Sequence, residues 1–151
     1  MQLGVIEFAR NVCNLKDAHS SEFDEETPHP VIDIMKSQEE KLKENRYGGT
    51  MRLGAYKCKL KEGTLSASAY DKQVVQERHR HRYELNNEYR SRLKEKGMKM
   101  AGVNPQRDLV EIIELENQDF FVATQFHPEF RSKPLKPHPL FKRFIKVAQS
   151  S

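Results

Sequence analysis

The start of the chain constrains the fold more than any other feature of the sequence. Between positions 2 and 14, apolar side chains recur at helical spacing and cover a wide face of the predicted helix. They are Leu3, Val5, Ile6, Phe8, Ala9, Val12 and Cys13. A helix this apolar must be covered by other parts of a domain. We therefore expect it to lie in a core. We also expect the 151 residues to be marginally stable alone and to need a partner or a dimer.

Strand patterns fill the middle of the chain. Residues 31–35 predict a short strand, and residues 51–60 predict an extended, half-buried segment in which Met51, Leu53 and Ala55 alternate with Arg52 and Gly54. Residues 74–79 have an extended pattern, and residues 98–103 and 109–115 predict a hairpin. The run 120–126 is almost entirely apolar, with aromatic and β-branched residues, and predicts a strand covered on both faces.

Helices and polar segments complete the pattern. Residues 16–30 predict a loop, the charged stretch 36–47 a surface excursion, and Gly48 with Gly49 a turn. A helix is expected from a cap at Asn86 or Asn87 to residue 96, with Gly97 as its stop, and another over residues 140–148. Helices at both ends with strands between them predict an α/β fold with a covered sheet.

Composition excludes several classes of protein. Lys and Arg outnumber Asp and Glu by only 26 to 22, which does not imply nucleic-acid binding. The apolar runs are too short to span a bilayer, and Glu7 and Arg10 interrupt any signal-like segment. Two cysteines form neither a disulfide framework nor a four-ligand zinc site. We expect a cytoplasmic protein that contacts neither membrane nor nucleic acid.

The clearest candidate for chemistry is His127, at the end of the apolar run, with Glu129 two residues later. Ligands and catalytic groups collect at strand ends in open α/β sheets. Pro128 keeps His127 extended and prevents a helix, so Glu129 can fold back on the imidazole and fix its tautomer. Such a dyad would activate a nucleophile. A structural histidine beside a solvated glutamate is the alternative.

A second candidate is the basic segment from Glu77 to Tyr83. Strand alternation would place Arg78, Arg80 and Arg82 on one face and two histidines, His79 and His81, on the other. Three guanidiniums could clamp carboxylates or phosphates, although a solvated edge strand explains the pattern equally well. A metal site at the two histidines is weakly supported, because no third ligand is spaced nearby in the sequence.

Neither the glycine-rich segment nor the cysteines carry a catalytic assignment. The segment GGTMRLG at 48–54 lacks the Lys-Ser/Thr of a P-loop, so it predicts close backbone approach at the start of a strand. Cys13 is expected to be a buried thiol on the first helix, and Cys58 lies between two lysines on a strand. Neither has the strand-to-helix turn that exposes a nucleophile.

Together, the motifs resemble the glutamine amidotransferase domain of the CTP synthase family over residues 1–148. The resemblance is carried by Met1 and Gln2 with VIEFAR at 5–10, SEF at 21–23, GGTMRLG at 48–54, ERHRHRYE at 77–84 with Asn86-Asn87, VEIIE at 110–114 and QFHPEF at 125–130. The last motif alone indicates a class I glutamine amidotransferase, and the GGTMRLG and RHRHRYE segments narrow the resemblance to CTP synthase.

The resemblance implies roles for particular residues. A cysteine thiol would attack the carboxamide of L-glutamine, with His127 as general base and acid and Glu129 as its orienting carboxylate. The residues implied to lie around the bound glutamine are Met1, Gln2, Glu22 at the α-amino group, and Arg82 at the carboxylate. The charge types fit, because an anion would hold an ammonium and a guanidinium a carboxylate.

The resemblance also implies partners. The ammonia would pass to a synthase domain that uses ATP and Mg²⁺ to convert UTP to CTP, and the full-length enzyme is implied to be a homo-oligomer. No cofactor or metal is implied within residues 1–151.

This sequence departs from the family pattern at its first residue. The family's nucleophile lies on a Gly-x-Cys-x-Gly-Met-Gln turn, and Met1 corresponds to the Met of that motif. We therefore expect residues 1–151 to be the C-terminal part of a three-layer α/β/α, flavodoxin-like amidotransferase domain. The N-terminal part of its sheet and the synthase domain would lie outside this sequence, and the chain alone would not hydrolyse glutamine.

Two alternatives remain open. One is a non-catalytic regulatory module that binds an anionic metabolite or RNA through Arg78, Arg80 and Arg82. The other is an amidotransferase domain that serves another synthetase.

Overall fold

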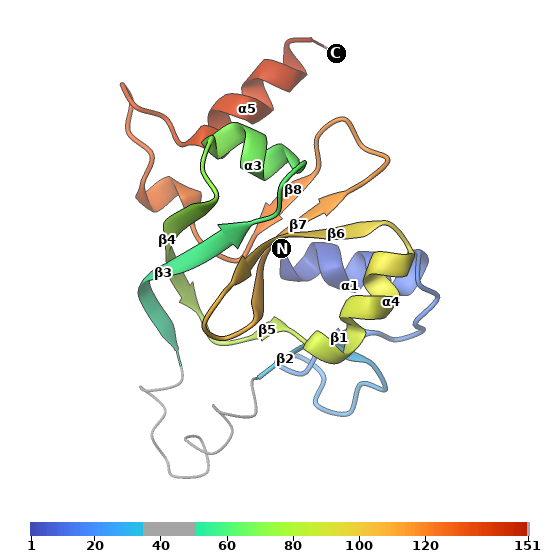
Figure 1. Ribbon diagram of the computed structural model, residues 1–151. Helices are drawn as coiled ribbons and strands as arrows, with labels where there is room; N and C mark the ends of the chain where they lie inside the picture. Colours follow the sequence, from blue (N-terminus) through green and yellow to red (C-terminus); the bar gives the residue numbers. More distant parts are fainter. Residues whose placement is uncertain (35–50, 151) are drawn as a thin grey trace.

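A five-stranded sheet lies at the centre of the molecule, as the computed structural model of residues 1–34 and 51–150 shows (Figure 1). Its order is β4-β3-β6-β7-β8, and every neighbouring pair is antiparallel. The strands are β3 (Arg52–Leu60), β4 (Val74–His81), β6 (Met98–Asn104), β7 (Leu109–Leu115) and β8 (Val122–Thr124). A smaller sheet joins β1 (His19–Ser20), β2 (Pro30–Asp33) and β5 (Glu84–Leu85), with β1 parallel to β2.

Side-chain caps stabilise the first turns of three of the described helices. The α-helices are α1 (Gln2–Asn11), α3 (Leu65–Tyr70), α4 (Arg90–Glu95) and α5 (Pro139–Ala148), and the short 3-10 helices are η2 (Asn87–Tyr89) and η3 (Pro128–Phe130). The side chains of Thr64, Asn86 and His138 cap α3, η2 and α5. Gly97, at φ +100°, follows α4 as predicted. Helix α3 was not predicted.

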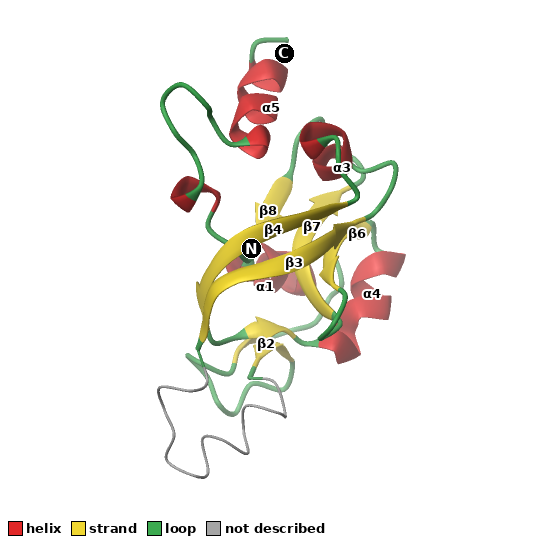
Figure 2. Cartoon of the chain, turned by 60° about the vertical axis from the view of Figure 1, so that its left-hand side comes forward, coloured by secondary structure: helices red, strands yellow, loops and turns green. Residues whose placement is uncertain are grey.

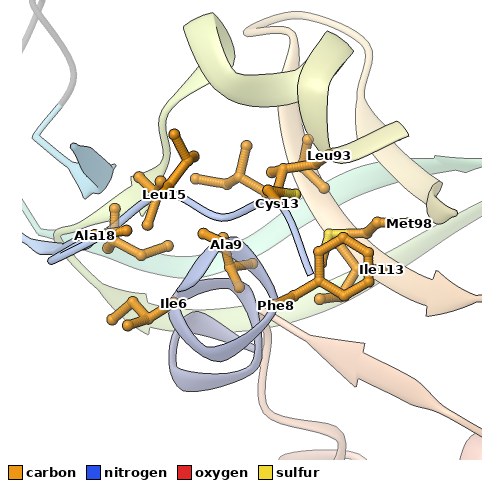
Figure 3. Packing of buried hydrophobic residues seen from close by; sticks show 14 of the residues in the cluster. Ile6, Phe8, Ala9, Cys13, Leu15, Ala18, Leu93, Met98 and Ile113 are labelled. Carbon is orange, nitrogen blue, oxygen red and sulfur yellow. The ribbon is translucent and has the colours of Figure 1, made fainter. Parts of the chain in front are cut away.

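Two hydrophobic cores lie on opposite faces of β6 and β7. The first contains α1, whose Phe8 lies beside Met98 and Ile113, and Ile6 and Ala9 belong to the same cluster (Figure 3). The second joins Cys58, Ala101 and Ile112 to residues of α3 and α5. Because adjacent residues Ile112 and Ile113 point to opposite faces, the sheet separates the two cores. Figure 2 shows α3 and α5 on the side of the sheet away from α1. The expected α/β fold is confirmed.

The predicted apolar helix at the start of the chain is also confirmed. Four of its residues are buried in the first core, whereas Leu3 and Val12 remain exposed. The chain itself therefore covers most of this face. Whether the 151 residues need a partner stays a prediction.

Strand β3 has the expected extended, half-buried form, and the face that carries Arg52 points to the interior. Leu53 is 57% exposed and Met51 also faces solvent, whereas the Arg52 side chain is 1% exposed. The buried positions Cys58 and Leu60 share the face of Arg52. A charged side chain can point inward here because buried carboxylates, described below, compensate the charge of Arg52.

The run 120–126 also differs from its prediction as a strand covered on both faces. Only Val122–Thr124 form β8, all three residues are half-buried, and the strand lies at one edge of the described sheet. Phe126 is buried in the second core beyond the end of the strand. Phe120 and Phe121, at the other end of the run, line a cavity of about 400 Å³ beside α5. The apolar pattern therefore reflects side chains with two different surroundings, the second core and this cavity.

Some predictions lie outside the described residues. They are the end of the strand at residue 35, the excursion at 36–47 and the turn at Gly48 and Gly49. Within the described ranges, no helix has both the length and the apolar character needed to cross a membrane.

Candidate functional site

His127 and Glu129 form the dyad that their spacing predicts. The imidazole Nδ1 lies 2.7 Å from Oε1 of Glu129, and the ring of Phe130 stacks on the imidazole at 5.0 Å. Burial alone would raise the pKa of Glu129, but the hydrogen bond from His127, a backbone hydrogen bond and the charges of His127 and His138 together hold the pKa below its usual value. The carboxylate is therefore ionised near neutrality. It accepts the Nδ1 proton, which leaves Nε2 of His127 as the basic atom.

Backbone hydrogen bonds bring the two histidine-containing motifs together. The amide of His127 donates to the carbonyl of Arg78 on β4 at 2.9 Å. Two residues earlier, the amide of Gln125 donates to the carbonyl of Glu111 on β7 at 2.9 Å. The segment that carries the dyad is thus held between two strands of the sheet, although the motifs are about fifty residues apart in the sequence.

The carbonyl of Tyr83 connects three parts of the site. It accepts hydrogen bonds from Nε2 of Gln2 at 3.0 Å and from Nε2 of Gln125 at 2.8 Å, and it lies 3.1 Å from Nδ1 of His81. Gln2 opens α1, Tyr83 lies between β4 and β5, and Gln125 precedes the dyad. The structure therefore places the predicted residue Gln2 two hydrogen bonds from the dyad segment.

Two other residues predicted to surround glutamine, Glu22 and Arg82, lie near the same tyrosine. Burial raises the pKa of the Tyr83 hydroxyl, the charge of Glu22 raises it further and the charge of Arg82 lowers it, so both charges act at this position. Glu22 is exposed, while Arg82 is half-buried and its Nε has no hydrogen-bond partner among the described residues. Met1 immediately precedes α1, makes no side-chain capping hydrogen bond, and packs against the first core.

A buried ionic cluster lies behind these residues. Arg52 contacts Oε1 of Glu84 at 3.0 Å and Oε1 of Glu111 at 2.8 Å, and all three side chains are at most 2% exposed. Burial raises the pKa of Glu84 to about 7, although Arg52 opposes this, and burial also raises the pKa of Glu111. One guanidinium compensates the charge of only one of the two carboxylates. Because the pKa of Glu84 is about 7, partial protonation of this carboxyl group reduces the remaining negative charge near neutrality.

The histidines of β4 extend this cluster. His79 Nδ1 lies 2.8 Å from His81 Nε2, and His81 Nδ1 faces the carbonyl of Tyr83, which requires a proton on Nδ1 of each ring. Burial, followed by the charge of Arg52, lowers the pKa of His79 to about 2 and of His81 to about 4. Both rings are therefore neutral and relay a hydrogen bond to the Tyr83 carbonyl.

With Glu111, the two histidines form a group whose ligand atoms lie within 4.8 Å of one another. The fold thus supplies a third potential metal ligand that the sequence spacing did not reveal. The geometry nevertheless favours a hydrogen-bonded cluster, because Glu111 is bound by Arg52 and the two facing ring nitrogens bond to each other. The guanidinium of Arg52 supplies the positive charge that a metal cation would otherwise provide to Glu111.

The remaining sequence candidates are the arginines of the basic segment and the two cysteines. Arg78 and Arg80 are exposed on β4 as alternation predicts, whereas Arg82 lies beyond the end of the strand. Cys13 and Cys58 are buried, and burial raises the pKa of both thiols. A nucleophilic cysteine needs the opposite shift.

Sequence reasoning did not find Arg52, Glu84, Glu111 or Gln125 as members of this site. It also missed a buried contact between Tyr70, Glu77 and His138, in which Glu77 Oε1 lies 2.8 Å from the tyrosine hydroxyl and 3.1 Å from Nε2 of His138. The available signal was the inward-facing position of both residues: Glu77 lies two residues from buried Val75, and Arg52 shares its face of β3 with buried Cys58 and Leu60.

An α/β domain with an oriented imidazole at a strand end is typical of enzymes in which histidine activates a nucleophile. The family comparison is specific. The chain matches the model of the family described as glutamine amidotransferase class-I over residues 1–147, and it belongs to that family.

Relatives from bacteria are similar over nearly the whole chain. Identity is 58% over 147 residues to a CTP synthase of Caldanaerobacter subterraneus subsp. tengcongensis, covering 97% of this chain and 27% of the relative. Identity is 59% over 145 residues to a CTP synthase of Rubrobacter xylanophilus, covering 96% of this chain and 26% of that relative. The chain thus spans about a quarter of the length of these curated relatives.

A solved structure has the same fold. The glutaminase domain of Trypanosoma brucei CTPS, with bound acivicin, matches with a TM-score of 0.90 and 38% identity, covering 100% of this chain and 58% of that one. The predicted resemblance to the CTP synthase amidotransferase domain is thereby confirmed.

Proposed function

We propose that this chain forms the C-terminal part of the glutamine-hydrolysing domain of a CTP synthase. In that protein, glutamine hydrolysis supplies ammonia for the ATP-dependent amination of UTP to CTP. The observation that carries the proposal is the 2.7 Å contact between His127 and Glu129, within a chain similar throughout to proteins named CTP synthase.

The dyad is suited to acid–base catalysis. With its Nδ1 proton held by Glu129, His127 accepts the proton of a cysteine thiol at Nε2, and the thiolate attacks the carboxamide carbon of glutamine. The imidazolium then returns the proton to the departing nitrogen, which leaves as ammonia. The imidazole next takes a proton from a water molecule that hydrolyses the thioester.

The residues near Tyr83 supply complementary charges for the substrate. We assign Glu22 to the α-ammonium of glutamine and Arg82 to its carboxylate, with Met1 and Gln2 beside the bound substrate. The Nε of Arg82 is buried and has no hydrogen-bond partner within residues 1–34 and 51–150, which supports this assignment, because a substrate carboxylate would provide an acceptor.

The nucleophile must come from outside the 151 residues. Cys13 and Cys58 are buried, and burial raises the pKa of both thiols. The synthase part, its ATP, Mg²⁺ and UTP, a homo-oligomeric assembly and a cytoplasmic location also belong to the proposed full-length enzyme. Residues 1–151 are assigned no cofactor or metal.

The test uses a chimera in which this chain replaces the matching segment of full-length Rubrobacter xylanophilus CTP synthase. We expect His127→Ala to reduce glutamine-dependent CTP formation about 10²–10⁴-fold, because general base catalysis is lost. Formation of CTP from added ammonium salt should be unchanged. Glu129→Gln keeps a hydrogen-bond acceptor but removes the charge, so it should lose less glutamine-dependent CTP formation than Glu129→Ala. Full glutamine-dependent activity of His127→Ala would refute the proposal.

A further inference from the structure

We propose that Gln125 is a positioning residue for glutamine hydrolysis. Its side-chain amide fixes the segment that carries Arg82 and Tyr83 relative to the segment that carries His127. The inference rests on the proposed function, because it concerns the alignment of the base with the substrate.

Gln125 lies where three segments meet. Its side chain is buried, and its Nε2 donates to the Tyr83 carbonyl at 2.8 Å. Gln2 donates to the same carbonyl at 3.0 Å and lies 3.5 Å from Oε1 of Gln125. The amide therefore joins the start of α1, the connection between β4 and β5, and the segment that precedes the dyad.

The backbone on both sides of this amide is already fixed. The amide nitrogens of Gln125 and His127 donate to the carbonyls of Glu111 and Arg78, on β7 and β4. Those bonds hold the dyad segment to the sheet, but they do not hold the loop at residues 82–83. The distance between the dyad segment and the loop at residues 82–83 is set by a side chain of the dyad segment that reaches the Tyr83 carbonyl. Among the described residues, Gln125 provides that side chain.

Charged and titratable groups surround the amide. Its Nε2 lies 3.3 Å from Oε2 of Glu84 and 3.5 Å from Nδ1 of His81, and Arg52 contacts the other oxygen of Glu84. An uncharged donor suits this position, because it bonds to the Tyr83 carbonyl and to Glu84 without adding charge to the cluster. A carboxylate in its place would repel Glu84 and could not donate.

Two variants separate positioning from simple destabilisation. Gln125→Met keeps the length of the side chain and removes its donor, so we expect a 10–100-fold loss in kcat/KM for glutamine at every pH. Gln125→Glu can donate to the Tyr83 carbonyl only when the new carboxyl is protonated. Its loss relative to the parent should therefore shrink at least threefold between pH 8 and pH 6. The matched control is Gln73→Glu, an exposed position outside the site, which should retain parental activity at both pH values.

The measurements are made on the full-length chimera with glutamine and, separately, with ammonium salt. The proposal expects both Gln125 variants to keep ammonia-dependent CTP formation while glutamine-dependent formation falls. Parental glutamine kinetics in Gln125→Met, or a Gln125→Glu defect that does not change with pH, would overturn it. An equal loss of ammonia-dependent activity would also overturn it, since that indicates general disruption. If His127→Ala abolishes glutamine use while Gln125→Met does not, this inference fails and the proposed function stands.

Discussion

Replacement of Arg52 by Met removes the cation of the buried cluster while nearly preserving side-chain length. In the parent, the guanidinium lies 3.0 Å from Glu84 and 2.8 Å from Glu111, and none of these side chains is more than 2% exposed. It also lies 4.5 Å above the ring of Tyr56. The variant leaves two buried carboxyl groups without a counter-ion, which is the costly way to break a buried ion pair.

The expected loss of stability is about 3–5 kcal/mol at pH 8, the usual cost of stranding one partner of such a pair. The second carboxyl group adds little to this loss of stability. The pKa of Glu84 is already about 7, so Glu84 becomes neutral by taking up a proton. Burial already raises both carboxyl pKa values in the parent, and Arg52 opposes that rise, so its removal raises both pKa values further. The folded variant therefore binds more protons than the folded parent between the parent and variant pKa values. It gains stability relative to the parent as the pH falls through that interval, which for Glu84 lies above about pH 7. The gain is up to about 1.4 kcal/mol per pH unit for each carboxyl.

Urea unfolding of the chimaeric amidotransferase domain, followed by circular dichroism between pH 5 and pH 8, measures this difference. The control is Lys99→Met, which breaks an exposed contact of 3.8 Å with Glu116 and should cost at most about 1 kcal/mol. A loss below 1 kcal/mol in Arg52→Met, or a loss that grows as the pH falls, would show that the cluster does not carry the charges described above.

Two further predictions follow from other parts of the structure. Gly102→Ala should destabilise the same domain by about 1–3 kcal/mol in urea unfolding, because its new Cβ would lie 2.6 Å from Sγ of Cys58 and 2.8 Å from Cγ1 of Ile112; Gly4→Ala, with its nearest contact at 3.4 Å, should not. The purified 151-residue chain should release no ammonia from glutamine. Release that persists in a Cys13→Ser, Cys58→Ser variant would disprove the need for an external thiol, and release lost in Cys13→Ser alone would identify that residue as the nucleophile.

Local sequence patterns predicted most elements and the dyad because both depend on short-range geometry. The helix at α1, the hairpin of β6 and β7 and the cap at Asn86 each follow from neighbours within one or two turns. The dyad also needed only the spacing of His127 and Glu129 and the restriction imposed by Pro128. Recognition of the family then supplied the expected roles of Glu22 and Arg82, which remain predictions.

The buried cluster could not be predicted because its members come from separate strands. Arg52 on β3, Glu84 on β5 and Glu111 on β7 meet only after the sheets have formed. A charged residue beside exposed apolar neighbours also gives a misleading pattern, and so the burial of Arg52 was not predicted. The role of Gln125 was not predicted for the same reason, since its partner at Tyr83 is about forty residues away.

Burial of Arg52 also explains how the sheet can position the His127–Glu129 dyad at its edge. Arg52 pairs with His81 and Ala55 with Arg78 in the antiparallel register of β3 and β4. A slip of β3 by one residue would turn Leu53 inward and Arg52 outward, leaving Glu84 and Glu111 without their cation. The cluster therefore specifies this register. Because the carbonyl of Arg78 holds the amide of His127, the same register determines where the imidazole lies. An ion pair that contributes little net stability can thus be retained for the geometry that it imposes on the site.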